Sequence, residues 1–104
     1  MARKRYAVEY VEGIEDDLAE LRAYDRARIL DKIDAQLIHE PTRETRNRKL
    51  LVGLVPPWDY IESAWELRVG EYRVFYDMDV KTFTVTIRAI RFKPPGKTME
   101  AILW

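Results

Sequence analysis

Residues Trp65–Tyr76 read WELRVGEYRVFY, and this stretch decides how the chain folds. Apolar and polar side chains alternate on both sides of Gly70-Glu71, a dipeptide that suits a two-residue hairpin loop with glycine supplying positive φ. The tightest hairpin places Arg68 opposite Arg73, and like charges directly opposite each other destabilise a strand pair. We infer that this strand pair gathers positive charge on one face for a functional reason.

A third strand is expected to extend the hairpin. Residues 83–92 again have strand character, and a four-residue turn at Asp79–Thr82 would place Arg73 opposite Arg88. Because side chains alternate between the two faces of a strand, Arg68, Arg73 and Arg88 are predicted to form a row on one face. The opposite face is then apolar and is expected to be covered by helices.

The first forty residues supply the other elements. Alternation over residues 4–11 predicts an N-terminal strand, and apolar residues at helical spacing predict one helix starting at Ile14. A second helix is expected from Asp25, its predicted N-cap, to about Glu40, where Pro41 ends it. The two helices are predicted to form an antiparallel hairpin.

Two segments remain. Residues 41–63 are interpreted mostly as loop, and the tail is expected to form a short C-terminal helix capped by Thr98. The whole chain, residues 1–104, is therefore predicted to be one α+β domain. It has an N-terminal strand, a helical hairpin packed on one sheet face, a three-stranded antiparallel meander and a short end helix, in the order β-α-α-β-β-β.

Composition excludes several classes of function. The chain has no cysteine and one histidine, which excludes disulfides, thiol catalysis and cysteine-bound or multi-histidine metal sites. We therefore expect neither a metal nor a small-molecule cofactor. No apolar run approaches the roughly 18 residues of a membrane span. The 18 basic and 18 acidic residues balance to zero net charge, and a cytoplasmic location is the simplest expectation.

The predicted arginine face suggests a chemistry. The planar guanidinium group binds phosphate well, and arginine and aromatic rings such as Phe75 can stack on unpaired bases. An open sheet face with these residues predicts a nucleic-acid cradle. The alternative is that Glu66 and Asp77 pair with the arginines and that the face is simply solvated.

The element order and the string LRVGEYRVFYDMD resemble the RelE/ParE superfamily of bacterial type II toxin–antitoxin toxins. The segments HEPTRETRNRKLL and VTIRAIRFKPPGKTMEAIL are similar to a RelE-like subgroup, so the resemblance covers nearly the whole chain. It implies a cytoplasmic toxin that is neutralised by a small antitoxin protein. RelE-like members enter the ribosomal A site and cut mRNA by attack of a ribose 2′-hydroxyl on the adjacent phosphate, so ribosome and mRNA are expected partners.

The resemblance also implies site residues. The catalytic arginine of the family's hairpin falls on Arg73, and the basic position after its last strand falls on Lys93. Glu66, which is predicted to lie on the arginine face, is the candidate general base, and an ion-pair partner is the alternative. The candidate RNA- or phosphate-binding residues are the other basic residues of the sheet face and of the segment before it: Arg68, Arg88, Arg91, Arg46, Arg48 and Lys49.

Two other functions stay open. RelE-like nucleases often carry a tyrosine or a His-Tyr pair in the tail, and the tail KPPGKTMEAILW has neither, which favours a ParE-like gyrase-inhibiting toxin. Zero net charge favours a non-catalytic relative of the fold that exists only as an antitoxin-bound partner. The apolar side chains of the tail are expected to be incompletely buried and to contribute to an antitoxin interface: Met99, Ile102, Leu103 and Trp104.

Overall fold

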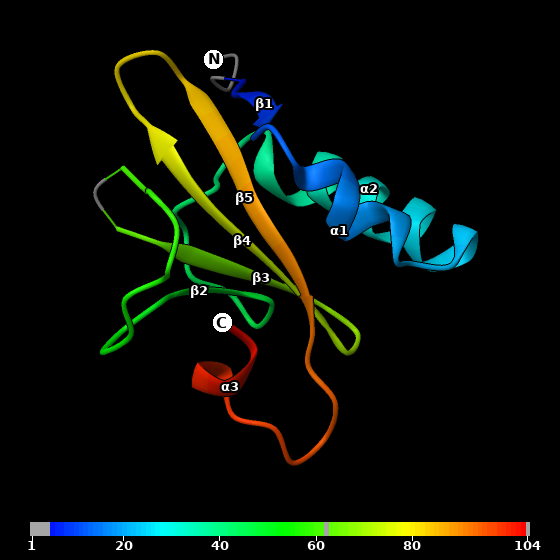
Figure 1. The fold of residues 1–104 in the computed structure, drawn as a ribbon. Helices are drawn as coiled ribbons and strands as arrows, with labels where there is room; N and C mark the ends of the chain where they lie inside the picture. Colours follow the sequence, from blue (N-terminus) through cyan, green and yellow to red (C-terminus); the bar gives the residue numbers. More distant parts are fainter. Residues whose placement is uncertain (1–4, 62, 104) are drawn as a thin grey trace.

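A five-stranded mixed sheet forms the centre of the computed structural model, which describes residues 5–61 and 63–103 (Figure 1). The strands are β1 (Ala7–Tyr10), β2 (Arg48–Leu50), β3 (Trp65–Val69), β4 (Tyr72–Asp79) and β5 (Thr84–Phe92), and the helices are α1 (Ile14–Ala19), α2 (Ala23–Leu37) and α3 (Met99–Leu103). The strand order is β1-β5-β4-β3-β2, with β1 parallel to β5 and the other neighbours antiparallel. The α+β prediction is confirmed, but β2 was missed because its segment was interpreted as loop.

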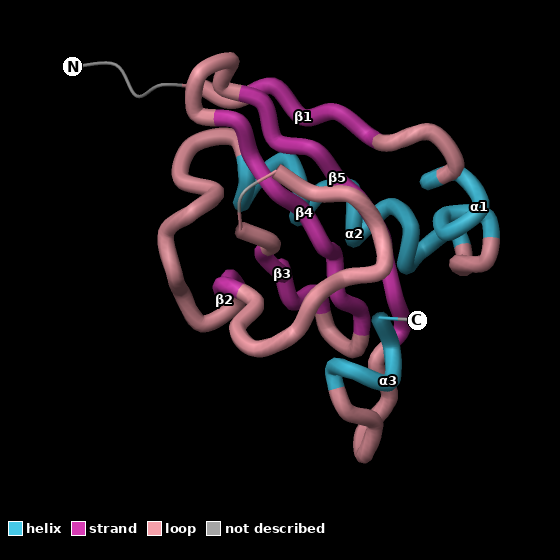
Figure 2. Tube along the Cα trace, turned by 60° about the vertical axis from the view of Figure 1, so that its left-hand side comes forward, coloured by secondary structure: helices cyan, strands magenta, loops and turns pink. Residues whose placement is uncertain are grey.

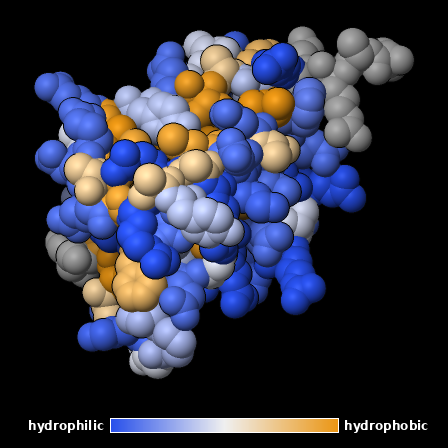
Figure 3. Space-filling model, turned by 90° about the vertical axis from the view of Figure 1, so that its right-hand side faces the viewer, coloured by the Kyte–Doolittle hydropathy of each residue, from blue (hydrophilic) through white to orange (hydrophobic). Residues whose placement is uncertain are grey.

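Helices α1 and α2 lie on one side of the sheet (Figure 1). Helical spacing predicts an inward face of α2 formed by Ile29, Leu30, Ile33 and Leu37. Ile29, Ile33 and Leu37 are fully buried and Leu30 is partly buried, which confirms this face. They pack in one cluster with sheet residues that include Leu67, Val74, Tyr76, Val85 and Ile87. Figure 3 shows the outer side of this layer, where hydrophilic side chains predominate. Within residues 5–61 and 63–103, no helix is long and apolar enough to cross a bilayer.

Arginines from neighbouring elements bind the carbonyl groups at the ends of α1 and α2. Neither helix has a basic residue in its own last turn, so its last carbonyls need other donors. Arg26 donates hydrogen bonds of 3.1 Å to the carbonyl of Leu18 and 3.2 Å to that of Leu21. Arg48 likewise donates hydrogen bonds to carbonyl groups at the end of α2. That helix ends at Leu37 and not near Glu40.

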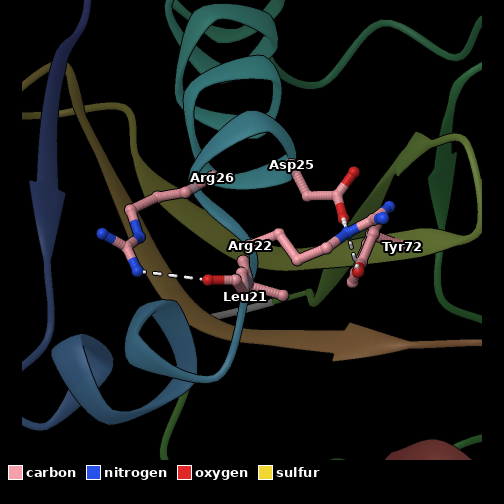
Figure 4. A network of polar contacts seen from close by, with 5 residues as sticks. All are labelled: Leu21, Arg22, Asp25, Arg26 and Tyr72. Atoms are coloured by element: carbon pink, nitrogen blue, oxygen red, sulfur yellow. Dashed lines mark hydrogen bonds and ion pairs between the residues drawn. The ribbon is translucent and has the colours of Figure 1, made fainter.

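The start of α2 also differs from the prediction. Arg22, and not Asp25, is the N-cap residue, and Asp25 lies buried in the first turn. Its carboxylate accepts hydrogen bonds from Arg22 at 3.1 Å and from the Tyr72 hydroxyl at 3.2 Å (Figure 4). Asp25 therefore ties the helical layer to the beginning of β4.

The opposite face of the sheet is partly covered. In Figure 2 the loop between β2 and β3 crosses in front of the sheet while α2 lies behind it. Phe75, on the covered face, is fully buried, and its ring centroid lies 5.3 Å from that of Trp58 in this loop. The prediction of an open face with Phe75 free to stack on bases is therefore wrong, because the loop and α3 both pack there.

Helix α3 belongs to this second core. The hydroxyl of Thr98 accepts a hydrogen bond from the amide of Ala101, which confirms the predicted cap. Ile102 is 7% exposed and Leu103 is 1% exposed. The expectation that these two side chains are incompletely buried is wrong, since they pack with Phe75. Trp104, named in the same expectation, lies outside the described residues.

The predicted strand register is confirmed in the β3–β4 hairpin and is wrong in the β4–β5 hairpin. Arg68 does lie opposite Arg73. The following loop, however, is formed by residues 80–83, because Asp79 still pairs with Thr84 and accepts the amide of Lys81 with its side chain. This shift and a β-bulge further along β5 together place Arg91, and not Arg88, opposite Arg73.

A β-bulge changes the register within the pair formed by β4 and β5. Tyr76 lies opposite Ile87 and Phe75 lies opposite Ala89, so Arg88 is an extra residue between the two pairs. A bulge of this kind shifts the alternation of the strand by one position. Before Arg88, the odd-numbered residues of β5 therefore face the helices. After Arg88, the even-numbered residues face them.

Gly70 gives a test of the hairpin turn. Its φ is +59°, and a Cβ atom there would lie 2.1 Å from Nη2 of Arg28. Gly53 has a similar φ of +76°, but no heavy atom of the described part lies within 4 Å of its Cβ position. We expect Gly53→Ala to cost about 1 kcal/mol of unfolding free energy from the left-handed backbone, and Gly70→Ala to cost slightly more, because the flexible end of the Arg28 side chain must also move aside.

Urea denaturation of both variants measures this difference. Removing the obstructing side chain should bring the cost of Gly70→Ala, measured in an Arg28→Ala background, down to that of Gly53→Ala. Equal costs for the two glycine variants in the parent background would show that the contact with Arg28 has no energetic weight.

Candidate functional site

A basic pocket of about 170 Å³ lies on the sheet face opposite α2. It is lined by Arg46, Asn47, Lys49, Glu66, Arg68, Arg73, Lys93 and Met99. Two larger hollows, of about 460 and 470 Å³, both include Tyr72 and Phe92, but their lining mixes charges of both signs. The basic pocket instead has five cations around one carboxylate, and it contains all three residues predicted as catalytic.

Strand alternation delivers these side chains to the pocket. Lys49 of β2 lies opposite Glu66 of β3, and Arg68 of β3 lies opposite Arg73 of β4. All four have the same parity relative to the sheet, so their side chains share the face that Phe75 also occupies. Three neighbouring strands thus each contribute charge to a single cavity.

Arg73 is the most firmly held member of the pocket. Its residue surface is only 8% exposed, and its Nη1 donates hydrogen bonds of 3.0 Å to the carbonyl of Gly70 and 2.9 Å to that of Tyr72. Burial, together with the neighbouring charge of Arg68, lowers the pKa of the guanidinium group below its usual value. The group nevertheless stays charged at neutral pH, and its orientation is fixed before any ligand arrives.

Glu66 is partly buried and is in an unusual electrostatic position. Burial raises the pKa of its carboxyl above the usual value, while the charges of Arg73, Lys49, Lys93 and Arg68 act in the opposite direction. Its Oε2 atom is buried and has no hydrogen-bond partner among the described residues. No ion pair within 4 Å in this part of the chain involves Glu66, so the interpretation of Glu66 as a simple ion-pair partner is not supported.

Lys93 reaches the pocket from the end of β5. Its amide donates a hydrogen bond of 2.6 Å to the carbonyl of Glu71, which extends the pairing with β4 beyond Phe92. If Arg88 paired with Phe75 and no bulge formed, the alternation of β5 would turn Lys93 toward the helical side. The bulge therefore places this cation beside Arg73.

Arg48 does not enter the pocket, although it was predicted to bind phosphate. It is 8% exposed, and its guanidinium group donates hydrogen bonds to the carbonyls of Gln36 and Glu40. Its neighbour Lys49 points to the pocket, so strand alternation requires Arg48 to point to the helices. Its contacts support a structural role at the end of α2.

Arg88 and Arg91 also lie outside the pocket lining. Arg88 pairs with the fully buried carboxylate of Asp77, with an Nε–Oδ2 distance of 2.8 Å. Arg91 pairs with Asp17 of α1 at 2.9 Å and lies over the ring of Trp58, 5.6 Å from its centroid. The predicted row of Arg68, Arg73 and Arg88 is thus corrected: its third member by register is Arg91, which turns away toward α1.

Two lining residues were not predicted from the sequence. Asn47 directly precedes β2, and Met99 begins α3. Neither lies in a pattern that points to a site, since both come from segments whose position depends on tertiary packing. A group of three or more histidine, aspartate or glutamate side chains able to hold a metal ion is not found within residues 5–61 and 63–103.

No protein-family model and no curated protein sequence matches the chain. Solved structures do match. A chain of the archaeal RelE–RelB complex from Pyrococcus horikoshii is 24% identical with a TM-score of 0.67, covering 90% of this chain and 99% of that one. A chain of the RelBE2 toxin–antitoxin complex from Mycobacterium tuberculosis is 24% identical with a TM-score of 0.65, covering 86% and 92%.

The isolated RelE toxin from E. coli is similar as well. It is 16% identical with a TM-score of 0.63, and the match covers 88% of each chain. At such identities the likeness concerns the backbone, and it shows that this chain has the fold of these RelE structures. The fold expected from the hairpin motif is thereby confirmed.

Proposed function

From the RelE fold we propose that this chain is the toxin of a type II toxin–antitoxin system and that it cuts mRNA on the ribosome. The observation that carries the proposal is the basic pocket, which gathers Arg73, Lys93 and Glu66 around one cavity. Arginine, lysine and a carboxylate supply charge stabilisation and proton transfer without a metal ion.

The proposed reaction is an internal transesterification. The 2′-oxygen of a ribose attacks the adjacent phosphorus, the bond to the 5′-oxygen of the next nucleotide breaks, and a cyclic 2′,3′-phosphate and a 5′-hydroxyl result. Glu66 accepts the proton of the 2′-hydroxyl, and the ammonium group of Lys93 donates a proton to the departing 5′-oxygen. Arg73 and Arg68 stabilise the negative charge that develops on the non-bridging phosphate oxygens.

The proposed partners are a small antitoxin protein, the ribosome and mRNA, and the proposed location is the cytoplasm. The M. tuberculosis structure is described as a toxin–antitoxin complex and the P. horikoshii structure as a RelE–RelB complex, which supports an antitoxin partner. Arg46 and Lys49 lie at the rim of the basic pocket, where exposed cations are suited to the backbone of RNA. Co-purification of the chain with the product of the adjacent gene tests the antitoxin.

A gyrase-inhibiting toxin is the second candidate. Among the described tail residues beyond Lys93, only Met99 lines the pocket, and a thioether cannot transfer a proton. A toxin directed at gyrase does not need a residue for that step. The tail therefore favours this candidate, while the gathered cations and the carboxylate favour the nuclease.

Two assays run side by side test the proposal. Ribosomes programmed with a defined mRNA are incubated with the protein, and cleavage is mapped in the A-site codon. Gyrase supercoiling is measured at the same protein concentration. We expect cleavage only when the mRNA is bound to the ribosome, and unchanged supercoiling. Inhibited supercoiling with intact mRNA would instead establish the second candidate.

A further inference from the structure

The basic pocket leaves one polar atom unused. Its cations are Arg46, Lys49, Arg68, Arg73 and Lys93, contributed by the segment before β2, by β2, β3 and β4, and by the residue after β5. The charges of all but Arg46 act to lower the pKa of the Glu66 carboxyl, yet its buried Oε2 has no hydrogen-bond partner among the described residues. A buried carboxylate oxygen without a hydrogen bond is costly.

A proton on Oε2 would change what this atom requires. The neutral carboxyl group becomes a donor and needs an acceptor, but the arginine and lysine side chains around it are donors only. Of the remaining lining residues, Met99 offers a weak acceptor, and Asn47 is exposed to solvent. A ligand that enters the pocket can supply a strong acceptor to this atom. The non-bridging oxygens of a phosphodiester are acceptors that also attract the surrounding cations.

We propose that Glu66 takes up a proton when a phosphodiester anion enters the basic pocket, so that Glu66 serves as the base of the proposed reaction only above the pH at which the bound form loses this proton. This inference rests on the proposed function for its ligand class. It adds a coupling between binding and protonation that can be measured without the ribosome.

The sign of the coupling follows from electrostatics. In the free protein the four nearest cations hold the pKa of Glu66 down against the effect of burial. A bound phosphodiester offsets those cations and adds a negative charge, so it raises the pKa of Glu66 further. Between the free and the bound pKa values, binding takes up a proton, and affinity falls as pH rises. A pKa moved toward neutrality also suits a group that exchanges protons at that pH.

The experiment uses a dinucleotide of deoxythymidine as the probe. It has no 2′-hydroxyl and so is not cleaved, and its phosphodiester keeps one charge over the range in which a carboxyl titrates. Binding is followed by NMR chemical shifts over a pH series. We expect the dissociation constant to rise with pH by up to about tenfold per pH unit within the window. Calorimetry in two buffers of different ionisation enthalpy should report the uptake of up to about one proton.

Two variants test whether the proton taken up on binding resides on Glu66. Glu66→Gln, which keeps the shape but cannot titrate, should bind with an affinity that does not change over this window. Glu44→Gln makes the same change at an exposed position outside the pocket lining and should keep the parent slope. A pH-independent affinity in the parent, or a slope that survives in Glu66→Gln, overturns the inference.

Absence of binding at every pH also overturns the inference. In that case, cleavage of ribosome-bound mRNA by the same preparation would show that the proposed function holds without the coupling. The two failures are therefore distinguishable.

Discussion

Replacing Arg73 with alanine should slow single-turnover cleavage of ribosome-bound mRNA by roughly two to three orders of magnitude. One preorganised donor aimed at a developing anion contributes on the order of 3–4 kcal/mol to the transition state. Arg73 is preorganised in this sense, because the carbonyls of Gly70 and Tyr72 hold its guanidinium group in a buried position. Arg73→Lys should restore only part of the rate, since a point charge does not reproduce the planar fork.

The same substitution is also expected to affect folding. The two carbonyls lose a charged donor, at a cost of about 1–3 kcal/mol of unfolding free energy, so thermal melting must accompany the kinetics. Arg43→Ala is the matched control, because Arg43 is exposed, pairs only with Glu40 among the described ion pairs and lies outside the pocket lining. A folded Arg73→Ala protein that cleaves at the parent rate would contradict the assignment.

Replacing Asp77 with leucine should lower the free energy of unfolding by about 3 kcal/mol. The carboxylate is fully buried and binds Arg88 through two contacts, of 2.8 and 3.3 Å. Removing it leaves the guanidinium group, whose side chain is only 17% exposed, without its counter-charge. Removing one partner of a buried pair costs about 3–5 kcal/mol, and the remaining exposure of Arg88 places this case at the lower end.

The double variant separates lost pairing from lost packing. Asp77→Leu combined with Arg88→Met replaces both charges by apolar groups, which at buried ion pairs is often neutral or stabilising. We therefore expect the double variant to unfold in urea near the parent midpoint, well above Asp77→Leu alone. A double variant as unstable as the single one would show that the volume of residue 77, and not the unpaired charge, sets the cost.

The local part of the fold could be predicted from the sequence. The β3–β4 register follows from the two-residue loop at Gly70-Glu71, where glycine satisfies a geometric requirement of the turn. The inward face of α2 follows from helical spacing, since burial imposes the period. The tail cap at Thr98 is similarly local. In each case a few adjacent residues fully determine the geometry.

The missed features depend on contacts between distant segments. Strand β2 has three residues, too few for a periodic signal, and exists because Lys49 and its neighbours pair with β3. The loop over Phe75 lies where it does because Trp58 and α3 pack there. In the turn after β4, Asp79 fits either the turn or the strand by composition, and the sheet decides between them.

The candidate site shows the same division. Glu66, Arg68 and Arg73 share the pocket because the one well-predicted hairpin carries them. Arg48 was assigned to phosphate by its charge, and Arg88 by a strand register that the structure does not have. Their actual partners are helix carbonyls and a buried carboxylate, which no sequence pattern reveals.

The extra residue at Arg88 has an evolutionary consequence. Deleting Arg88 would remove the bulge but leave Ala89 opposite Phe75 and Phe92 opposite Tyr72, so Lys93 would stay on the pocket face. The cost of this deletion would fall on Asp77, whose buried carboxylate would lose its ion-pair partner. Selection should therefore keep Arg88 for the stability of the fold, whereas a working toxin needs the register of the residues that follow it.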